Sequence, residues 1–147
     1  MSTIIKPEKQ LILQDLCSRL LCGVVCRITF TYSNETTFGE EVENEVDDTI
    51  SMINTKRETV FADYLGREFD IENVKPYLRS MDDMTEEEYK EYWNIDNRSY
   101  SCPMVCAHIP ASERIDWLNK RHFDYRGLIG KCLAIKVDEI NNPYDKL

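Results

Sequence analysis

Residues 7–32 read PEKQLILQDLCSRLLCGVVCRITFTY, and this stretch decides the fold class because it joins a helical pattern to a strand pattern at one glycine. Pro7 suits the first turn of a helix, where its missing N–H is not needed. Gly23 supplies the left-handed stop that ends many helices. The stretch therefore predicts a helix up to Gly23, with apolar side chains recurring at near-helical spacing at Leu11, Ile12, Leu16 and Leu20.

Strict alternation follows the glycine and predicts a strand over residues 24–32. One face of this strand carries Val24, Cys26, Ile28, Phe30 and Tyr32. Two further strands are expected over residues 48–53 and 58–65, paired as an antiparallel hairpin across Asn54 to Arg57. A last strand is expected over residues 131–137, followed by a loose tail at Asn141-Asn142-Pro143.

Two more helices are expected in the second half of the chain. Thr85 and Glu88 form a capping box that predicts a helix start, with the helix running to about Trp93 or Asn94. A shorter helix is expected over residues 112–121. Residues 74–79 contain Pro76 and are interpreted as an ordered connector without regular structure, and residues 96–110 as irregular.

These elements predict an α+β fold in a single domain that spans residues 1–147. The expected architecture is an antiparallel sheet of about four strands with three helices packed on one face. A barrel-like closure of the short strands is the alternative. The length is enough for one domain to bury its own core.

Composition limits the class of protein. The apolar and charged fractions are those of a globular chain, and no apolar run approaches the roughly 20 residues of a membrane helix. The first residues lack the pattern of a secretory signal, so we expect a cytoplasmic protein whose six cysteines are thiols. A net charge of −9 argues against binding nucleic acid through its backbone, and no cofactor is expected.

One cysteine pair offers a weak alternative in the form of a metal site. Cys102, Cys106 and His108 place three potential zinc ligands within seven residues. Zinc sites generally use a tighter first pair and a second pair elsewhere, so a distant ligand such as Cys22 or Cys26 would be needed. Ordinary thiols are the favoured interpretation.

Acidic side chains are concentrated in two runs. The favoured interpretation is a solvated surface, and the sharper one is an acidic surface that attracts a basic partner. The runs consist of Glu40, Glu41, Glu43, Glu45, Asp47 and Asp48, and of Asp82, Asp83, Glu86, Glu87, Glu88 and Glu91.

The densest mixture of chemically versatile side chains lies in residues 117–129. As a binding site, Arg126 would hold a phosphate or carboxylate, Tyr125 or Phe123 would stack on a ring, and Gly127 would allow close approach. As a structural brace, Phe123 and Leu128 would fill the core while Asp124 and Arg126 pair with each other or with the backbone. The brace is favoured, and the candidate binding residues are Trp117, His122, Asp124, Tyr125, Arg126 and Gly127.

A catalytic interpretation ranks third. His122 and Asp124 would serve as a base and its orienting group, with Cys102 or Cys106 as nucleophile. No glycine-flanked serine, HExxH motif or P-loop accompanies them. We therefore expect a protein without enzymatic activity.

Aromatic residues gather around the helix predicted after Thr85. Tyr89, Tyr92 and Trp93 share one face through their three- and four-residue spacing, with Tyr77 and Tyr100 nearby in the sequence. Such a face is more often core than surface, although tyrosines at its edge would suit a protein interface.

Three segments carry a resemblance to a known family. KPYLRSM at residues 75–81, MTEEE at 84–88 and HFDYRGLI at 122–129 resemble an uncharacterised family of small proteins from gut Bacteroidetes, their phages and mobile elements. The resemblance covers less than half of the chain and implies no activity. It implies an accessory or phage-borne protein that works in a bacterial cytoplasm.

Three functions follow as hypotheses. The preferred one is a non-enzymatic binding protein that contacts another protein, such as a phage or mobile-element factor that modulates a host protein. The second is a binder of a small nucleotide-like anion through the Arg126 loop. The third is a hydrolase or transferase that uses His122, Asp124 and a cysteine.

Overall fold

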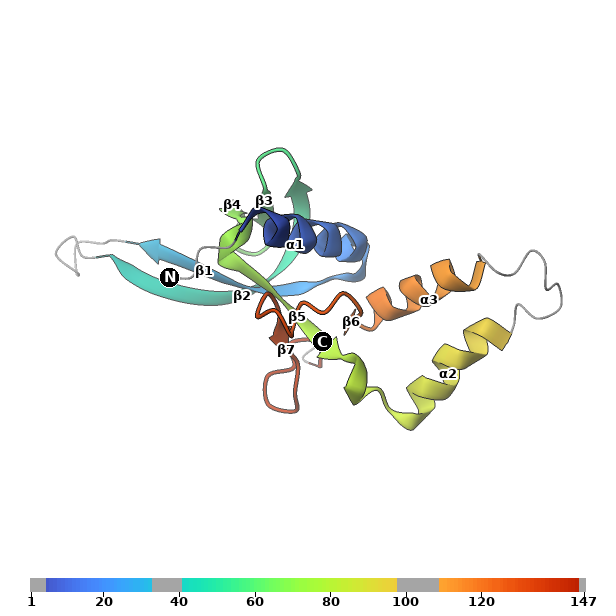
Figure 1. Ribbon diagram of the computed structural model, residues 1–147. Coiled ribbons are helices and arrows are strands. Elements are labelled where there is room, and N and C mark those ends of the chain that lie inside the picture. The colour runs from blue at the N-terminus through green and yellow to red at the C-terminus, as the bar shows by residue number, and fades with distance from the viewer. Residues whose placement is uncertain (1–4, 33–40, 98–108, 146–147) are drawn as a thin grey trace.

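A computed structural model describes residues 5–32, 41–97 and 109–145 and has an α+β fold. Figure 1 shows a central twisted sheet with α1 lying across one face and α2 and α3 extending from one side. Within the described residues the helices are α1 (Lys6–Arg19), α2 (Glu86–Asn97) and α3 (Ile109–Lys120). The strands are β1 (Val25–Tyr32), β2 (Val42–Asn54), β3 (Thr59–Ala62), β4 (Arg67–Asp70), β5 (Val74–Ser80), β6 (Phe123–Asp124) and β7 (Ile135–Lys136).

The sheet is larger than expected and is mixed. In the described parts of the chain seven strands follow the order β4-β3-β2-β1-β5-β6, with β7 paired to β5 beside this path. The pairings among β1 to β5 are antiparallel, whereas β6 and β7 each pair with β5 in parallel. The expectation of about four antiparallel strands was wrong in its details: the antiparallel strands β4 and β5 were not expected, and the parallel strands β6 and β7 are too short to carry an alternating pattern. Among the described strands the order does not close on itself, so the barrel-like alternative was wrong too.

Residues 5–32 confirm the sequence patterns. Ile12 and Leu16 of α1 are fully buried, and α1 is followed by a short 3-10 turn, Leu20–Cys22. Gly23 takes the left-handed conformation with φ 70°, which favours glycine. Cys26 and Ile28 of β1 face the core with no exposure.

Strand β5 replaces the connector expected around Pro76. Pro76 pairs with Cys26 of β1, and the partners of β7 begin only at Tyr77. At Pro76 the strand has β1 as its one described neighbour, and proline's missing donor is tolerated where a strand has an open side. The prediction of a connector was wrong because the sequence alone did not show that open side.

The helices do not share one face of the sheet, which corrects the expected architecture. α1 packs on the main core, which includes Leu16, Val24, Ile28 and Leu78. α2 and α3 form a separate cluster around Trp117, Leu118 and Phe123. In Figure 1 these two helices project beyond the sheet, and we call them the α2–α3 arm.

Candidate functional site

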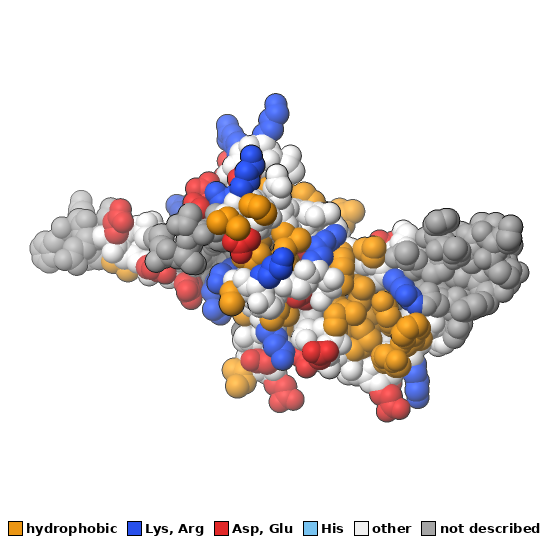
Figure 2. Space-filling view, in the orientation of Figure 1, with side chains coloured by type: hydrophobic (Ala, Val, Ile, Leu, Met, Phe, Trp, Pro, Cys, Tyr) orange, Lys and Arg blue, Asp and Glu red, His pale blue; other side chains and the backbone are white. Residues whose placement is uncertain are grey.

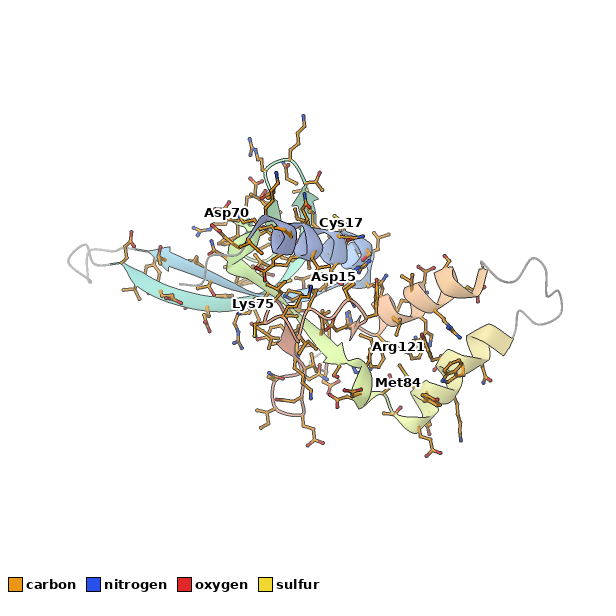
Figure 3. All side chains as sticks on the ribbon, viewed as in Figure 1. Asp15, Cys17, Asp70, Lys75, Met84 and Arg121 are labelled. Atoms are coloured by element: carbon orange, nitrogen blue, oxygen red, sulfur yellow. The ribbon has the colours of Figure 1, made fainter. Side chains whose placement is uncertain are left out.

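Two of the residues singled out in 117–129, Tyr125 and Arg126, belong to a buried ion-pair cluster around α1. Asp15 and Arg19 lie one helical turn apart, both without exposure, and Arg19 Nε donates to Asp15 at 2.9 Å. Arg126 Nη1 donates to the other Asp15 oxygen, also at 2.9 Å. Figure 3 shows Asp15 on the side of α1 that faces the later segments of the chain. One carboxylate thus binds two guanidinium groups, and each of these charges would be costly to bury without such a partner.

Tyr125 completes this Asp15 cluster. Its hydroxyl donates to Asn119 at 2.8 Å and accepts from Arg126 Nη1 at 2.9 Å. The guanidinium carbons of Arg19 and Arg126 lie 5.0 and 4.6 Å from the ring centroid of Tyr125. The ring and the hydroxyl of Tyr125 therefore both already have partners inside the protein.

Asp124 fixes the turn that follows β6. Its carboxylate accepts hydrogen bonds from the backbone N–H of Leu128 at 3.0 Å and of Ile129 at 2.9 Å. Gly127 sits in this turn with φ 76°, and a Cβ placed there would have nothing within 4 Å. The glycine is needed for its left-handed backbone rather than for a close approach within the protein.

His122 is held apart from Asp124. Its backbone is left-handed, with φ 63°, and its ring stacks on Tyr144 at a centroid distance of 3.6 Å. Burial lowers the pKa of His122 to about 4, with Arg19 and Arg79 adding repulsion. No hydrogen bond joins His122 to Asp124 in the described structure, so the base and orienting group are not assembled.

Trp117 belongs to the core of the α2–α3 arm. It is 7% exposed and stacks on Phe123 at 5.8 Å with nearly parallel rings. The guanidinium carbon of Arg121 lies 4.3 Å from the centroid of the Trp117 ring, and the same guanidinium group forms an ion pair with Glu91 of α2. Figure 3 shows Arg121 between the two helices.

The geometry of residues 117–129 thus matches the brace rather than an open binding loop. Phe123 and Leu128 are fully buried, as the brace predicted. Arg126 does bind a carboxylate, but its pairing with Asp124 was wrong; Asp124 pairs with the backbone instead, which was the stated alternative. The actual partner, Asp15, lies 111 residues earlier, and no local spacing announces it.

The potential zinc ligands Cys102, Cys106 and His108 lie outside the described residues. Among the residues that are described, no group of three histidine, cysteine or acidic side chains is placed to hold a metal. Cys26, considered as a distant fourth ligand, is fully buried in the sheet, where burial raises the pKa of its thiol.

Two of the acidic side chains stabilise the fold from within. Asp48 accepts the backbone N–H groups of Tyr64 and Leu65 at 3.1 and 2.8 Å, which fixes the turn after β3. Glu88 forms a two-pronged pair with Arg79, both bonds 2.7 Å long, and this pairing lowers the pKa of Glu88 to about 2. Asp48 and Glu88 are therefore structural, whereas the other described members of the two runs are exposed.

The polar side chains of a hollow beside β1 and β5 are also hydrogen-bonded to one another. It measures about 400 Å³ and includes Arg27, Asp47 and Tyr77 in its lining. The Tyr77 hydroxyl donates to Asp47 at 2.8 Å and accepts from Arg27 at 2.7 Å. Burial, together with the Asp47 bond, raises the pKa of Tyr77 to about 12, so this hydroxyl keeps its proton at neutral pH and is a poor acid.

The α2–α3 arm presents the aromatic surface that is left over. Tyr89 is 55% and Trp93 44% exposed, whereas Tyr92 is partly buried against Trp117. Figure 2 shows a broad field of hydrophobic side chains over these helices, edged by charged ones. We call Tyr89 and Trp93 the aromatic face. A buried face was the favoured prediction and an interface the alternative, because helical spacing alone does not show which side of a helix is covered.

A shallow hollow of about 370 Å³ lies on this aromatic face. Its lining consists of Tyr89, Lys90, Trp93 and Asn94. The rings of Tyr89 and Trp93 meet edge to face, with centroids 5.9 Å apart. This arrangement is suited to receiving one or two side chains of another molecule.

No protein-family model, curated protein or solved structure was found to match this chain. The likeness of residues 75–88 and 122–129 to a phage and mobile-element family therefore stays a prediction. Across the described helices, none has both the length and the apolar character needed to cross a membrane.

Proposed function

We propose that this is a non-enzymatic binding protein that captures another protein on the aromatic face of the α2–α3 arm. The observation that carries the proposal is the exposure of Tyr89 and Trp93, at 55% and 44%, on a helix that extends from the sheet. Exposed tyrosine and tryptophan are enriched at protein interfaces because they bury a large area with few rotatable bonds.

Internal contacts support this choice over the two other functions. Arg126, the candidate anion ligand, already donates to Asp15, Ser18 and Tyr125. His122, the candidate base, stacks on Tyr144 and has a depressed pKa. Tyr89 and Trp93, in contrast, expose about half of their surface to solvent, and a bound partner would remove that apolar surface from water.

A capture experiment tests the proposal. The full chain is immobilised, a lysate of a gut Bacteroidetes host is passed over it, and the retained proteins are identified by mass spectrometry. The double variant Tyr89→Ala/Trp93→Ala is expected to lose the retained partner, since truncating interface aromatics costs about 2 kcal/mol or more each.

The matched control is Tyr64→Ala, which removes a tyrosine that is 89% exposed on a different part of the surface. It should retain the same partner as the unmodified chain. Melting temperatures establish that each variant is folded. Retention of the same proteins by the double variant would contradict the proposal.

A further inference from the structure

Acidic side chains flank the aromatic face on its N-terminal side. Glu86 precedes Tyr89 by three residues and Trp93 by seven, so the three share one stripe of α2. Glu86 has 87% of its side chain exposed, and its pairing with Lys90, at 3.8 Å, is a loose surface contact. Glu87 is exposed beside it. Two carboxylates thus stand one helical turn before the hollow.

The same aromatic group already accepts a cation from α3. The guanidinium carbon of Arg114, from α3, lies 5.0 Å from the ring centroids of both Tyr92 and Trp93. Tyr89 extends the group outward through its edge contact with Trp93. Aromatic faces attract guanidinium and ammonium groups through their quadrupole, so the exposed side offers the same chemistry to a partner.

Charge argues against two other occupants. A second copy of this chain would bring the same acidic stripe and a net charge of −9 against itself. A nucleic acid would bring phosphates to Glu86 and Glu87. A segment rich in arginine or lysine is attracted by both carboxylates, and Lys90, the cation in the lining of the hollow, is itself paired with Glu86.

We infer that the partner presents an arginine- or lysine-bearing peptide segment to α2. A cation of that segment stacks on Tyr89 and Trp93, and a neighbouring cation pairs with Glu86 or Glu87. This inference rests on the proposed function and adds the chemistry of the partner to it. Opposite charges at the rim also raise the rate of association.

Selection from a displayed random-peptide library tests the inference without knowledge of the natural partner. The full chain is the target, and the folded Tyr89→Ala/Trp93→Ala variant is used to remove peptides that bind elsewhere. Peptides specific for the aromatic face are expected to be enriched in arginine and lysine over the starting library. Their affinity is then measured by fluorescence anisotropy.

Two charge variants separate a local effect from net charge. Glu86→Gln/Glu87→Gln keeps the size of both side chains and should weaken binding of the selected peptides about tenfold at low salt. Asp63→Asn/Glu139→Gln removes the same charge from exposed positions elsewhere and should change binding little.

The outcomes distinguish the inference from the proposed function. Selected peptides that are neutral or acidic, or that bind Glu86→Gln/Glu87→Gln as tightly as the unmodified chain, would overturn the basic partner but leave the aromatic face as a binding surface. Failure to select any peptide specific for the aromatic face would overturn the inference as well. The proposed function itself falls only when the lysate capture is unaffected by Tyr89→Ala/Trp93→Ala.

Discussion

Arg126 illustrates how one residue can satisfy the chemistry of a binding site and still serve the fold. Its side chain is 19% exposed and reaches the fully buried carboxylate of Asp15. Arg19 binds the same carboxylate and also donates to the carbonyl oxygen of Phe123 at 2.5 Å. The cluster therefore ties α1 to the segment after α3, and removing any member leaves polar groups without their partners.

Replacing Arg126 with alanine should destabilise the protein by about 2 kcal/mol, because a charged hydrogen-bonding group near a buried carboxylate is lost. Asp15 keeps Arg19, so the cost stays below that of a fully orphaned buried charge. Urea denaturation measures the change, with the exposed Lys131→Ala on the same segment as control. An unchanged denaturation midpoint would contradict the brace and return Arg126 to the list of binding residues.

His122 gives the fold a defined pH dependence. Its pKa falls from 6.5 to about 4 in the folded state, so between these values the unfolded chain binds a proton that the folded chain does not. Stability therefore decreases as the pH falls from about 6.5 to about 4 through this residue. Above that range the imidazole is neutral in both the folded and the unfolded chain, so it does not make the stability depend on pH.

The variant His122→Asn removes the titration and preserves the left-handed backbone, which asparagine tolerates. It loses the stacking on Tyr144 at every pH, so only the difference between two pH values matters. Urea denaturation at about pH 7 and about pH 5 measures the free energy of unfolding at each pH. This free energy should decrease less between the two pH values for the variant than for the unmodified chain. An equal loss would mean that His122 is protonated as readily in the folded as in the unfolded chain.

At the level of elements, α2 is attached by few but specific contacts. Thr85 and Glu88 form the predicted capping box, with both bonds at 3.1 Å, and Glu88 also grips Arg79 of β5. Tyr92 packs on Trp117 of α3. Much of the remaining described surface of α2 faces solvent, which leaves Tyr89 and Trp93 for a partner.

Backbone amides of α2 should exchange with solvent at least about tenfold faster than those of α1, because local opening of α2 exposes little apolar area. α1, in contrast, buries Ile12, Leu13 and Leu16 in the main core. Hydrogen exchange followed by mass spectrometry on peptides from the two helices measures this difference. Equal protection would show that both helices open only with the whole fold.

At the scale of the whole molecule, two apolar clusters are joined across β5 and β6. The main core lies between α1 and the sheet, and the second cluster lies inside the α2–α3 arm. Arg79 links them, since its backbone N–H binds the carbonyl of His122 at 2.7 Å and its guanidinium covers the Phe123 ring. The tail is fixed as well: the Tyr144 hydroxyl donates to the carbonyl of Tyr77 and accepts from the N–H of Val25, so the prediction of a loose end was wrong.

The sequence by itself determined the elements whose signals are local. The apolar spacing of α1, the stop at Gly23, the alternation in β1 and the capping box of Thr85 and Glu88 each act within a few residues, so they could be identified without a partner. The hairpin between β2 and β3 was predicted for the same reason, and Asn54 pairs with Thr59 across its turn.

Only the tertiary structure decided the remaining features. β5 runs through Pro76 because the neighbour on one side begins after it, and β6 and β7 are too short to carry a pattern. The partner of Arg126 and the exposure of Tyr89 and Trp93 depend on which distant surfaces meet. Pairings across about a hundred residues leave no periodic trace in a single sequence, because their free energy comes from contacts that exist only once the chain has folded.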